Sequence, residues 1–328
     1  MSGPAPATRP PATPPRAIAL MPAVLQHEWD LYHATWFTLM GVGGGIFLLS
    51  RLMRLERGLG VWLGLPVVDL VSFAVISAGG LLLIWSLGRP LRFLRAVLKP
   101  GTSWISRGAI ADFIFVALGG ALILPGLTLG SARPFAWLPW DAWASTTTGR
   151  VLEGVALASA AIVIVYAGLV LADKAAVTFW RSWAIPTQFV LSSLAMSMAT
   201  VMALQTAAGT PIETPECWLL AGFLALLLGA IAWHLGTRTA QPGKAEALAR
   251  LYTTYGAVFW VGVLAAGTVL PLLLALAAAA APPARDALGI VALALTLAGG
   301  FVLRLLTLRV GYFPPVSGVL RVPKGRTP

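Results

Sequence analysis

The chain has 328 residues, of which 58% are hydrophobic and 11% are charged. Soluble domains carry about 25% charged residues, so this composition excludes a water-soluble protein and predicts an integral membrane protein. The formal net charge of +11 is expected to lie in cytoplasmic loops and at lipid headgroups, and it does not indicate a nucleic-acid partner.

The N-terminal stretch, residues 1–22, contains seven prolines and two arginines but no long apolar run. It lacks the apolar centre of a secretory signal, and we expect a disordered extension outside the bilayer. Residues 23–312 then hold eight apolar segments, each near the ~20 residues that a spanning helix requires, and a tail follows over residues 313–328. The predicted fold is an all-α integral membrane protein, a bundle of eight transmembrane helices. The expected helices are Ala34–Leu52, Pro66–Leu87, Gly108–Gly130, Val151–Ala172, Trp183–Leu204, Trp218–Leu235, Tyr255–Ala281 and Ala287–Leu308.

Small residues are clustered in the first and fifth expected helices. Gly43, Gly44 and Gly45 lie in the first, and Ser193 and Ser197 lie in the fifth. Such residues let helices approach closely, which predicts a tightly packed bundle.

The basic residues divide unevenly between the two sides of the membrane. An even number of spans puts both ends of the chain on one side, here called face A; the opposite side is face B. Face A collects 17 of the 23 Lys and Arg residues, and 12 of the remaining 18 when the loop Gly88–Arg107 is left out. The positive-inside rule therefore predicts that face A, with both termini, is cytoplasmic and that the protein spans the cell membrane.

Polar side chains that could carry chemistry gather at face A. A belt of aromatic residues, here including Trp36, is usual at this level of a membrane protein, but a belt does not explain the acids. Asp112 falls in the first turns of an expected span, where an unpaired carboxylate is costly, and we expect Arg107 to be its partner. The polar candidates at face A are His27, Asp30, His33, Asp112, Tyr166 and His234.

Two acids at face B, Asp69 and Glu153, fall a few residues inside expected spans. Acids near helix N-termini are favoured by the helix dipole, and this explanation suffices for both. The functional alternative is that they mark one end of a proton path.

Few cofactors could be held by this chain alone. The single cysteine, Cys217, excludes a disulfide framework and an iron–sulfur cluster bound by this chain, since such a cluster needs about four thiolates. A haem could at most be bracketed by His33 and His234, both near one surface, and we expect none. No Gly-rich phosphate loop, Ser–His–Asp spacing or HExxH motif occurs, so we expect no metal ion and neither hydrolase nor nucleotide chemistry.

Two stretches resemble a known family. The run from Leu87 to Gly108, LGRPLRFLRAVLKPGTSWISRG, is similar to the loop between spans two and three of the NrfD/PsrC family. Tyr166–Asp173, YAGLVLAD, with Phe179–Pro186, FWRSWAIP, resembles its Tyr-x-Gly segment and the tryptophan and proline that open its fifth span. The glycine cluster Gly41–Gly45 and the eight spans also fit, so the resemblance covers most of the chain.

The resemblance implies a membrane anchor that interacts with quinone or quinol, either menaquinone or ubiquinone, in a molybdenum oxidoreductase, nitrite reductase or polysulfide reductase complex. It implies electron exchange with a four-cluster ferredoxin-like subunit, which serves a molybdopterin catalytic subunit. The family's quinone pocket lies among the first four helices at the docking face, and its tyrosine matches Tyr166. The family histidine of the first span falls at Phe37 or nearby, whereas His33 lies about one turn away.

Together, the resemblance and the polar residues predict a quinone site at face A. A tyrosine hydroxyl can donate a hydrogen bond to a quinone oxygen, and a histidine can take up a proton near neutral pH. The quinone-binding candidates are Tyr166, His33 or His27, and Asp30 or Asp112. The candidates for docking the iron–sulfur partner, which the predicted orientation puts in the cytoplasm, are Arg89, Arg92, Arg95, Lys99 and Arg107.

Other functions remain open on the sequence alone. The anchors of DMSO reductases share the eight-span plan, and His27-Glu28-Trp29 is similar to their N-terminus. A purely structural anchor, which holds a partner but binds no quinone, agrees with every feature of the sequence except the presence of Tyr166 in the Tyr-x-Gly motif. A secondary transporter would have a polar site near mid-membrane, where these spans are nearly uncharged.

Overall fold

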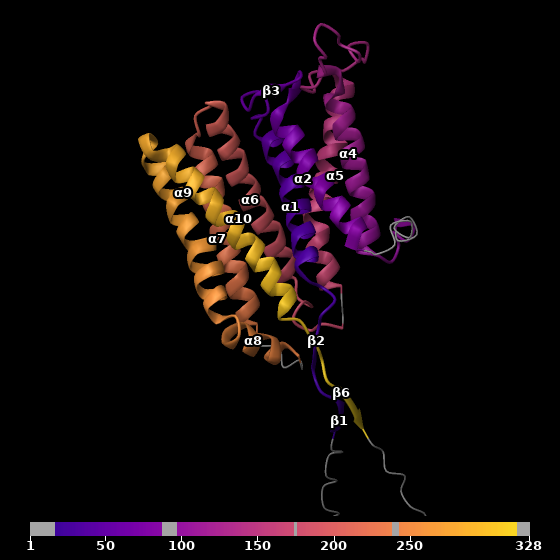
Figure 1. The fold of residues 1–328 in the computed structure, drawn as a ribbon, viewed down its shortest axis with the longest axis vertical. Helices are drawn as coiled ribbons and strands as arrows, with labels where there is room; N and C mark the ends of the chain where they lie inside the picture. The colour runs from indigo at the N-terminus through magenta and orange to yellow at the C-terminus, as the bar shows by residue number, and fades with distance from the viewer. Residues whose placement is uncertain (1–16, 87–96, 174–175, 238–242, 320–328) are drawn as a thin grey trace, which may run out of the picture.

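The computed structural model describes residues 17–86, 97–173, 176–237 and 243–319. Within this part of the chain, eight helices are long and apolar enough to cross a membrane, which confirms the predicted all-α bundle. Figure 1 shows them packed side by side, with the two ends of the described chain projecting from one end of the bundle. The helices are α1 Leu31–Leu52, α2 Val67–Ser86, α4 Trp104–Ile123, α5 Thr147–Ala172, α6 Ala184–Ala208, α7 Thr214–Gly236, the π-helix η3 Val258–Val269 continuing as α9 Leu270–Ala280, and α10 Arg285–Arg309.

Five of the helices, α1, α4, α5, α7 and α10, begin two to four residues earlier than expected, and the first two of these follow a polar capping residue. Asp30 precedes Leu31 and accepts hydrogen bonds from backbone N–H groups of the first turn of α1. Ser103 does the same before Trp104 at the start of α4. These caps satisfy backbone N–H groups that have no hydrogen-bond partner inside the helix. Because the capping residues lie outside the apolar run, a hydropathy pattern does not mark these helix starts.

The first helix is central to the bundle because it packs against α2, α5, α6 and α10. Its glycines make this possible. A Cβ atom at Gly43 would lie 2.8 Å from the backbone nitrogen of Ile76 in α2, and one at Gly45 would lie 2.2 Å from the hydroxyl of Ser197 in α6. These contacts agree with the tight packing that the small residues predict, and they show that the first and fifth spans pack against each other.

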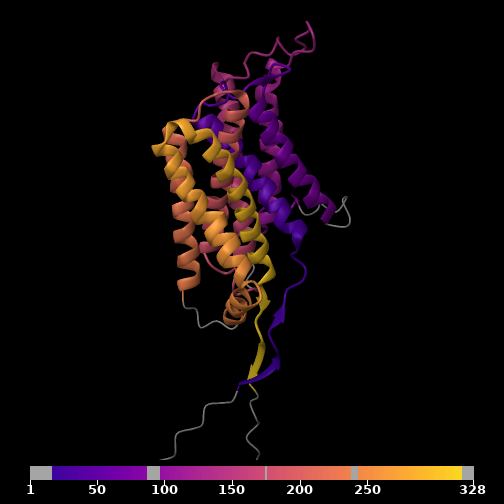
Figure 2. The same ribbon diagram turned by 60° about the vertical axis from the view of Figure 1, so that its left-hand side comes forward.

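The two ends of the described chain pair with each other at face A. Strand β1, Ala17–Met21, is antiparallel to β6, Val316–Val319, and β2, Val24–Leu25, is antiparallel to β5, Tyr312–Phe313. Figure 2 shows this ribbon leading away from the bundle. Both ends thus lie on the same side, as expected from an even number of spans.

The strands differ from the expected disordered extension over residues 1–22, of which residues 1–16 lie outside the described part. Pairing with a segment about 300 residues away satisfies the backbone donors and acceptors of both ends, and no local pattern reveals it. Two further small elements connect the spans: the hairpin of β3, Val61–Trp62, and β4, Leu65–Pro66, at face B, and helix α8, Lys244–Thr253, at face A.

Candidate functional site

Tyr166 is the centre of a contact between three helices near face A. Its side chain, on α5, is fully buried, and the ring of Trp36 from α1 stacks on it with a centroid separation of 6.2 Å. On the α4 side the backbone of Gly108 lies against the ring, because a Cβ atom there would be 2.2 Å from Cδ2 of Tyr166. The ring is therefore held between α1 and α4, and only a glycine fits at position 108 without displacement.

The glycine of the Tyr-x-Gly motif has a packing role of its own. A Cβ atom at Gly168 would lie 2.4 Å from Cα of Pro186, near the start of α6. The motif thus combines the buried Tyr166 with the close approach of α5 and α6.

Asp112 lies one turn beyond Gly108 on the same face of α4, and it faces the backbone of α2. A Cβ atom at Gly80 would be 3.3 Å from its Oδ2 atom, and the Asp112 carboxyl group lies near the Tyr166 side chain. The expected pairing with Arg107 is wrong. Five residues along an α-helix correspond to a rotation of about 140°, so the two side chains point to different sides of α4.

Arg107 instead contacts the loop that precedes α4. Its guanidinium donates hydrogen bonds to the carbonyls of Pro100 and Gly101, at 2.7 and 3.1 Å, and lies 4.4 Å from the ring centroid of Trp104. Of the other docking candidates, Lys99 is exposed. Arg89, Arg92 and Arg95 lie outside the described residues.

Three buried polar atoms in this layer have no hydrogen-bond partner among the described residues. They are Nε1 of Trp36, Oδ1 of Asp112 and the hydroxyl oxygen of Tyr166, one from each of α1, α4 and α5. Leaving a buried polar group unpaired costs about 1–3 kcal/mol. The sequence interpretation placed Trp36 in the interfacial belt, but the residue is 1% exposed and belongs to the site.

Asp30 and His33 extend the same group of residues toward the surface. The His33 ring lies 6.5 Å from the Trp36 ring, and its Nδ1 atom is 3.0 Å from Oδ1 of Asp30. Slight burial acts to raise the pKa of Asp30, but hydrogen bonds from His33 and from the backbone N–H of Tyr32 outweigh it and lower the pKa below its ordinary value. Four of the five quinone-binding candidates therefore lie along one route from the core to face A.

The fifth candidate, His27, lies elsewhere. It lines a crevice with Arg250 and Arg309, on the side of the bundle formed by α8 and α10. Asp30 also lines this crevice and at the same time contacts His33, so it lies between the crevice and the group of residues around Tyr166.

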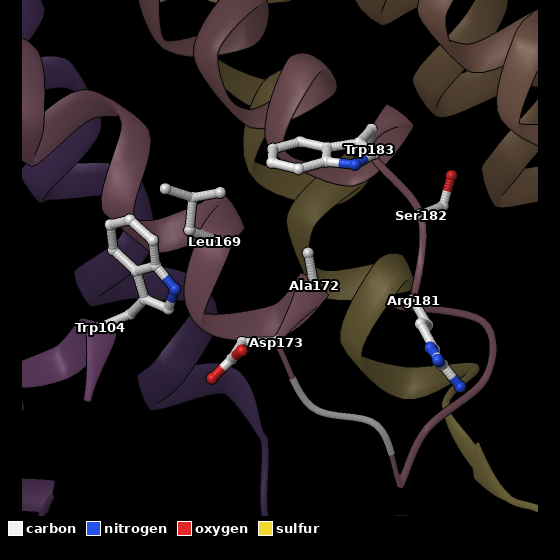
Figure 3. A pocket seen from close by; sticks show the side chains of 7 residues that line it. All are labelled: Trp104, Leu169, Ala172, Asp173, Arg181, Ser182 and Trp183. Atoms are coloured by element: carbon white, nitrogen blue, oxygen red, sulfur yellow. The ribbon is translucent and has the colours of Figure 1, made fainter. Parts of the chain in front are cut away.

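An open crevice lies at face A about one helical turn beyond Tyr166 along α5, and Figure 3 shows the residues that line it. Its volume is about 440 Å³, and it lies between the start of α4, the end of α5 and the start of α6. Trp104 in its wall is one turn before Gly108, and Leu169 is one turn after Tyr166. The lining residues are Trp104, Leu169, Ala172, Asp173, Arg181, Ser182 and Trp183.

The two proton-path candidates, Asp69 and Glu153, belong to a buried ion-pair cluster near face B. Arg51, which is 1% exposed, pairs with Asp69 and lies 3.6 Å from Glu153, and Arg54 lies 3.1 Å from Glu153. Asp69 is in the first turn of α2, where the dipole explanation applies, whereas Glu153 is beyond the first turn of α5. Whether the cluster passes protons stays a prediction.

The second half of the bundle holds His234, whose two ring nitrogens are buried without hydrogen-bond partners in the described residues. Its ring meets the ring of Phe179 edge-on at 4.7 Å, in an apolar environment distinct from that of His33. Among the described residues, no three His, Cys, Asp or Glu side chains are close enough together to hold a metal ion.

Comparison with known proteins agrees with the resemblance noted in the sequence. The model of a family described as "Polysulphide reductase, NrfD" matches residues 23–315, nearly the whole chain. No curated protein matches the chain. Members of this family are membrane subunits of quinone-linked reductase complexes. The eight spans and this match together show that the chain is a multi-pass membrane protein of the NrfD polysulphide reductase family.

Proposed function

We propose that this chain is the subunit that interacts with quinone or quinol in a respiratory oxidoreductase complex, and that Trp36, Asp112 and Tyr166 hold the quinone headgroup. The observation that carries the proposal is the group of three buried polar atoms without partners in the described residues, contributed by α1, α4 and α5. The crevice lined by Trp104 and Trp183 lies about one helical turn from Tyr166, and we propose that the headgroup reaches the layer from this side.

The donor set fits a quinone. A quinone has two carbonyl oxygens that accept hydrogen bonds, and the Trp36 indole and the Tyr166 hydroxyl each offer one donor. Hydrogen bonds to a ligand would remove the cost of leaving these donors unpaired, about 1–3 kcal/mol each. When bound, a quinone supplies two-electron chemistry that is coupled to two protons.

The acid–base groups of the site are placed to move those protons. Asp112 can hold a proton next to Tyr166. His33 and Asp30 are in direct contact, and the Asp30 side chain is 50% exposed at face A. A route from Tyr166 past Trp36 to His33 and Asp30 would connect the buried layer with water, using imidazole and carboxylate as the proton-transferring groups.

Electrons have to leave this chain for a partner, because one cysteine cannot ligate an iron–sulfur cluster. We propose that the partner is a four-cluster ferredoxin-like subunit, which serves a molybdopterin catalytic subunit. It would dock at face A over the basic loop that includes Lys99. We further propose that face A is cytoplasmic. A fluorescent protein fused after Pro328 should then be fluorescent, and an alkaline phosphatase fused there should be inactive; the opposite pattern would put the partner outside.

The test of the site is Tyr166→Phe in the assembled complex. The substitution keeps the buried ring and removes only the hydroxyl, so we expect quinol-dependent kcat/KM to fall about tenfold, the value of one hydrogen bond. Partner docking and complex yield should not change. Tyr252→Phe is the matched control, because Tyr252 is 41% exposed on α8 at the same face, and it should leave turnover unchanged.

Unchanged turnover and unchanged apparent quinol affinity in Tyr166→Phe would contradict the proposal. The chain would then be better described as a structural anchor, in which Tyr166 serves only to pack α4 against α5.

A further inference from the structure

A second crevice at face A lies on the other side of α1 from Tyr166. It has a volume of about 280 Å³ and lies between the segment that leads into α1, the end of α8, Tyr255 and the end of α10. Strand β5 contacts α8 and pairs with β2, so these segments are adjacent in the fold. Its polar lining residues are Gln26, His27, Asp30, Arg250, Tyr255 and Arg309.

The crevice has an excess of positive charge. Arg250 and Arg309 both line it, and no carboxylate among the described residues lies within ion-pair distance of either guanidinium. The Nε atom of Arg250 is buried without a hydrogen-bond partner in the described chain, and its guanidinium lies 5.5 Å from the ring centroid of Tyr255.

Asp30, the acid in the wall, does not neutralise these arginines. Its Oδ1 atom accepts hydrogen bonds from the backbone N–H groups of Tyr32 and His33 and lies 3.0 Å from the His33 ring. The Asp30 carboxylate is therefore occupied by groups at the start of α1. His27, which lines the crevice together with the two arginines, adds a further hydrogen-bond donor.

The crevice lies where the helices leave the membrane, next to a surface suited to lipid. Arg309 is the last residue of α10, and Tyr255 precedes η3 by three residues. Beyond Tyr255, Tyr252 and Trp260 stack at 6.1 Å, and Trp260 and Val261 are 54% and 62% exposed. Exposed aromatic and apolar side chains at this depth are typical of the membrane interface, and basic clefts between spanning helices bind phospholipid headgroups.

We propose that this crevice binds a phosphate group, paired with Arg250 and Arg309, and that its source is an anionic phospholipid whose acyl chains lie along the exposed face of η3. This site is separate from the quinone site, and the proposal does not depend on it.

The test uses the purified full chain in detergent, titrated with phosphatidylglycerol and observed by native mass spectrometry. Arg250→Gln/Arg309→Gln removes two charged contacts and should therefore weaken phosphatidylglycerol binding by at least about a hundredfold. Arg250→Lys/Arg309→Lys should recover part of the affinity. The matched control is Arg57→Gln/Arg133→Gln, which removes two exposed charges at face B and should bind as the wild type does. Arg309 is exposed, so the single variant Arg309→Gln should fold even if the double variant does not, and it tests the same site.

A parallel titration with inorganic phosphate distinguishes the two sources. Phosphatidylglycerol binding that depends on the arginines, with no binding of inorganic phosphate at similar concentrations, supports the lipid. Inorganic phosphate bound as tightly as phosphatidylglycerol would overturn the lipid as source. Equal lipid affinity in the wild type and in the Gln variants would overturn the site.

Discussion

Replacing Gly108 with alanine perturbs the candidate quinone site through a single methyl group. The new Cβ would lie 2.2–2.4 Å from three atoms of the Tyr166 ring, whereas carbon atoms in good contact are about 3.5–4.0 Å apart. The ring cannot turn outward, because it is fully buried and stacked on Trp36. Either the ring or α4 therefore has to move by about 1 Å.

The size of the effect follows from this displacement. Overpacking of a buried contact costs about 1–3 kcal/mol, which a bundle of eight spans should survive. Misplacing a catalytic group by about 1 Å can cost about 10²-fold in rate. Movement of α4 would displace Asp112 as well as the Tyr166 hydroxyl. We therefore expect Gly108→Ala to assemble into the complex but to lose about two orders of magnitude in quinol-dependent turnover, more than Tyr166→Phe loses.

Gly120→Ala is the matched control on the same helix. Nothing lies within 4 Å of a Cβ atom at this position, and replacing a helical glycine by alanine adds about 0.5–1 kcal/mol of stability. Quinol oxidation by the assembled complex and thermal unfolding of the purified protein would be measured for both variants. Equal turnover in Gly108→Ala and Gly120→Ala, with both folded, would refute the argument that the position of Tyr166 matters.

Three further changes test other parts of the structure. Arg51→Gln should reduce the free energy of unfolding by about 3–5 kcal/mol, because it leaves the buried Asp69 carboxylate without a counter-charge. Arg54 has a side chain that is 64% exposed, so Arg54→Gln should cost about 0–1 kcal/mol, and thermal unfolding compares the two variants. Asp30→Asn keeps a capping residue but removes the charge. Since the pKa of Asp30 is lowered in the folded state, the stability from its carboxylate is complete above the unfolded pKa and is lost as the pH falls through the folded value, so the difference in Tm between wild type and variant should disappear in acid. Lys99→Glu should weaken binding of the iron–sulfur partner, most strongly at low salt, in a co-purification assay.

Each of these expectations has a result that contradicts it. Equal melting temperatures for the Arg51 and Arg54 variants would mean that the buried ion pairs are not needed for stability. A Tm difference for Asp30→Asn that persists in acid would point to the geometry of the cap rather than to its charge. Assembly of the Lys99→Glu variant at wild-type yield in low salt would move the docking surface away from this loop.

The eight spans could be predicted because a membrane helix is specified by its length and hydropathy, both of which are local. The pairing of the two ends of the described chain could not be predicted in this way. Its strands, Ala17–Met21 and Val316–Val319, lie at opposite ends of the sequence, and neither shows the alternation of apolar and polar residues that predicts a half-buried strand. The role of Arg51 could not be predicted either, because a basic residue at the end of an apolar run usually faces the membrane surface, whereas Arg51 is buried against Asp69.

The candidate site was predicted in part. Tyr166 and Asp112 were singled out by a motif and by the cost of a carboxylate inside a span, and the structure brings them close together. Trp36 was grouped with the other tryptophans of the interface, although its position one turn after His33 places it deeper on the same face of the helix. The pairing of Asp112 with Arg107 failed because closeness in sequence was taken for closeness in space.

The central claim is that Trp36, Asp112 and Tyr166 hold a quinone headgroup, and photolabelling tests it most directly. An azido-substituted quinone would be activated by light in the purified complex, and the labelled peptides would be identified by mass spectrometry. We expect the label on α1, α4 and α5, with displacement by excess unmodified quinone and a lower yield in Tyr166→Phe. Competable labelling confined to α6, α7 and α10, with an unchanged yield in Tyr166→Phe, would contradict the assignment.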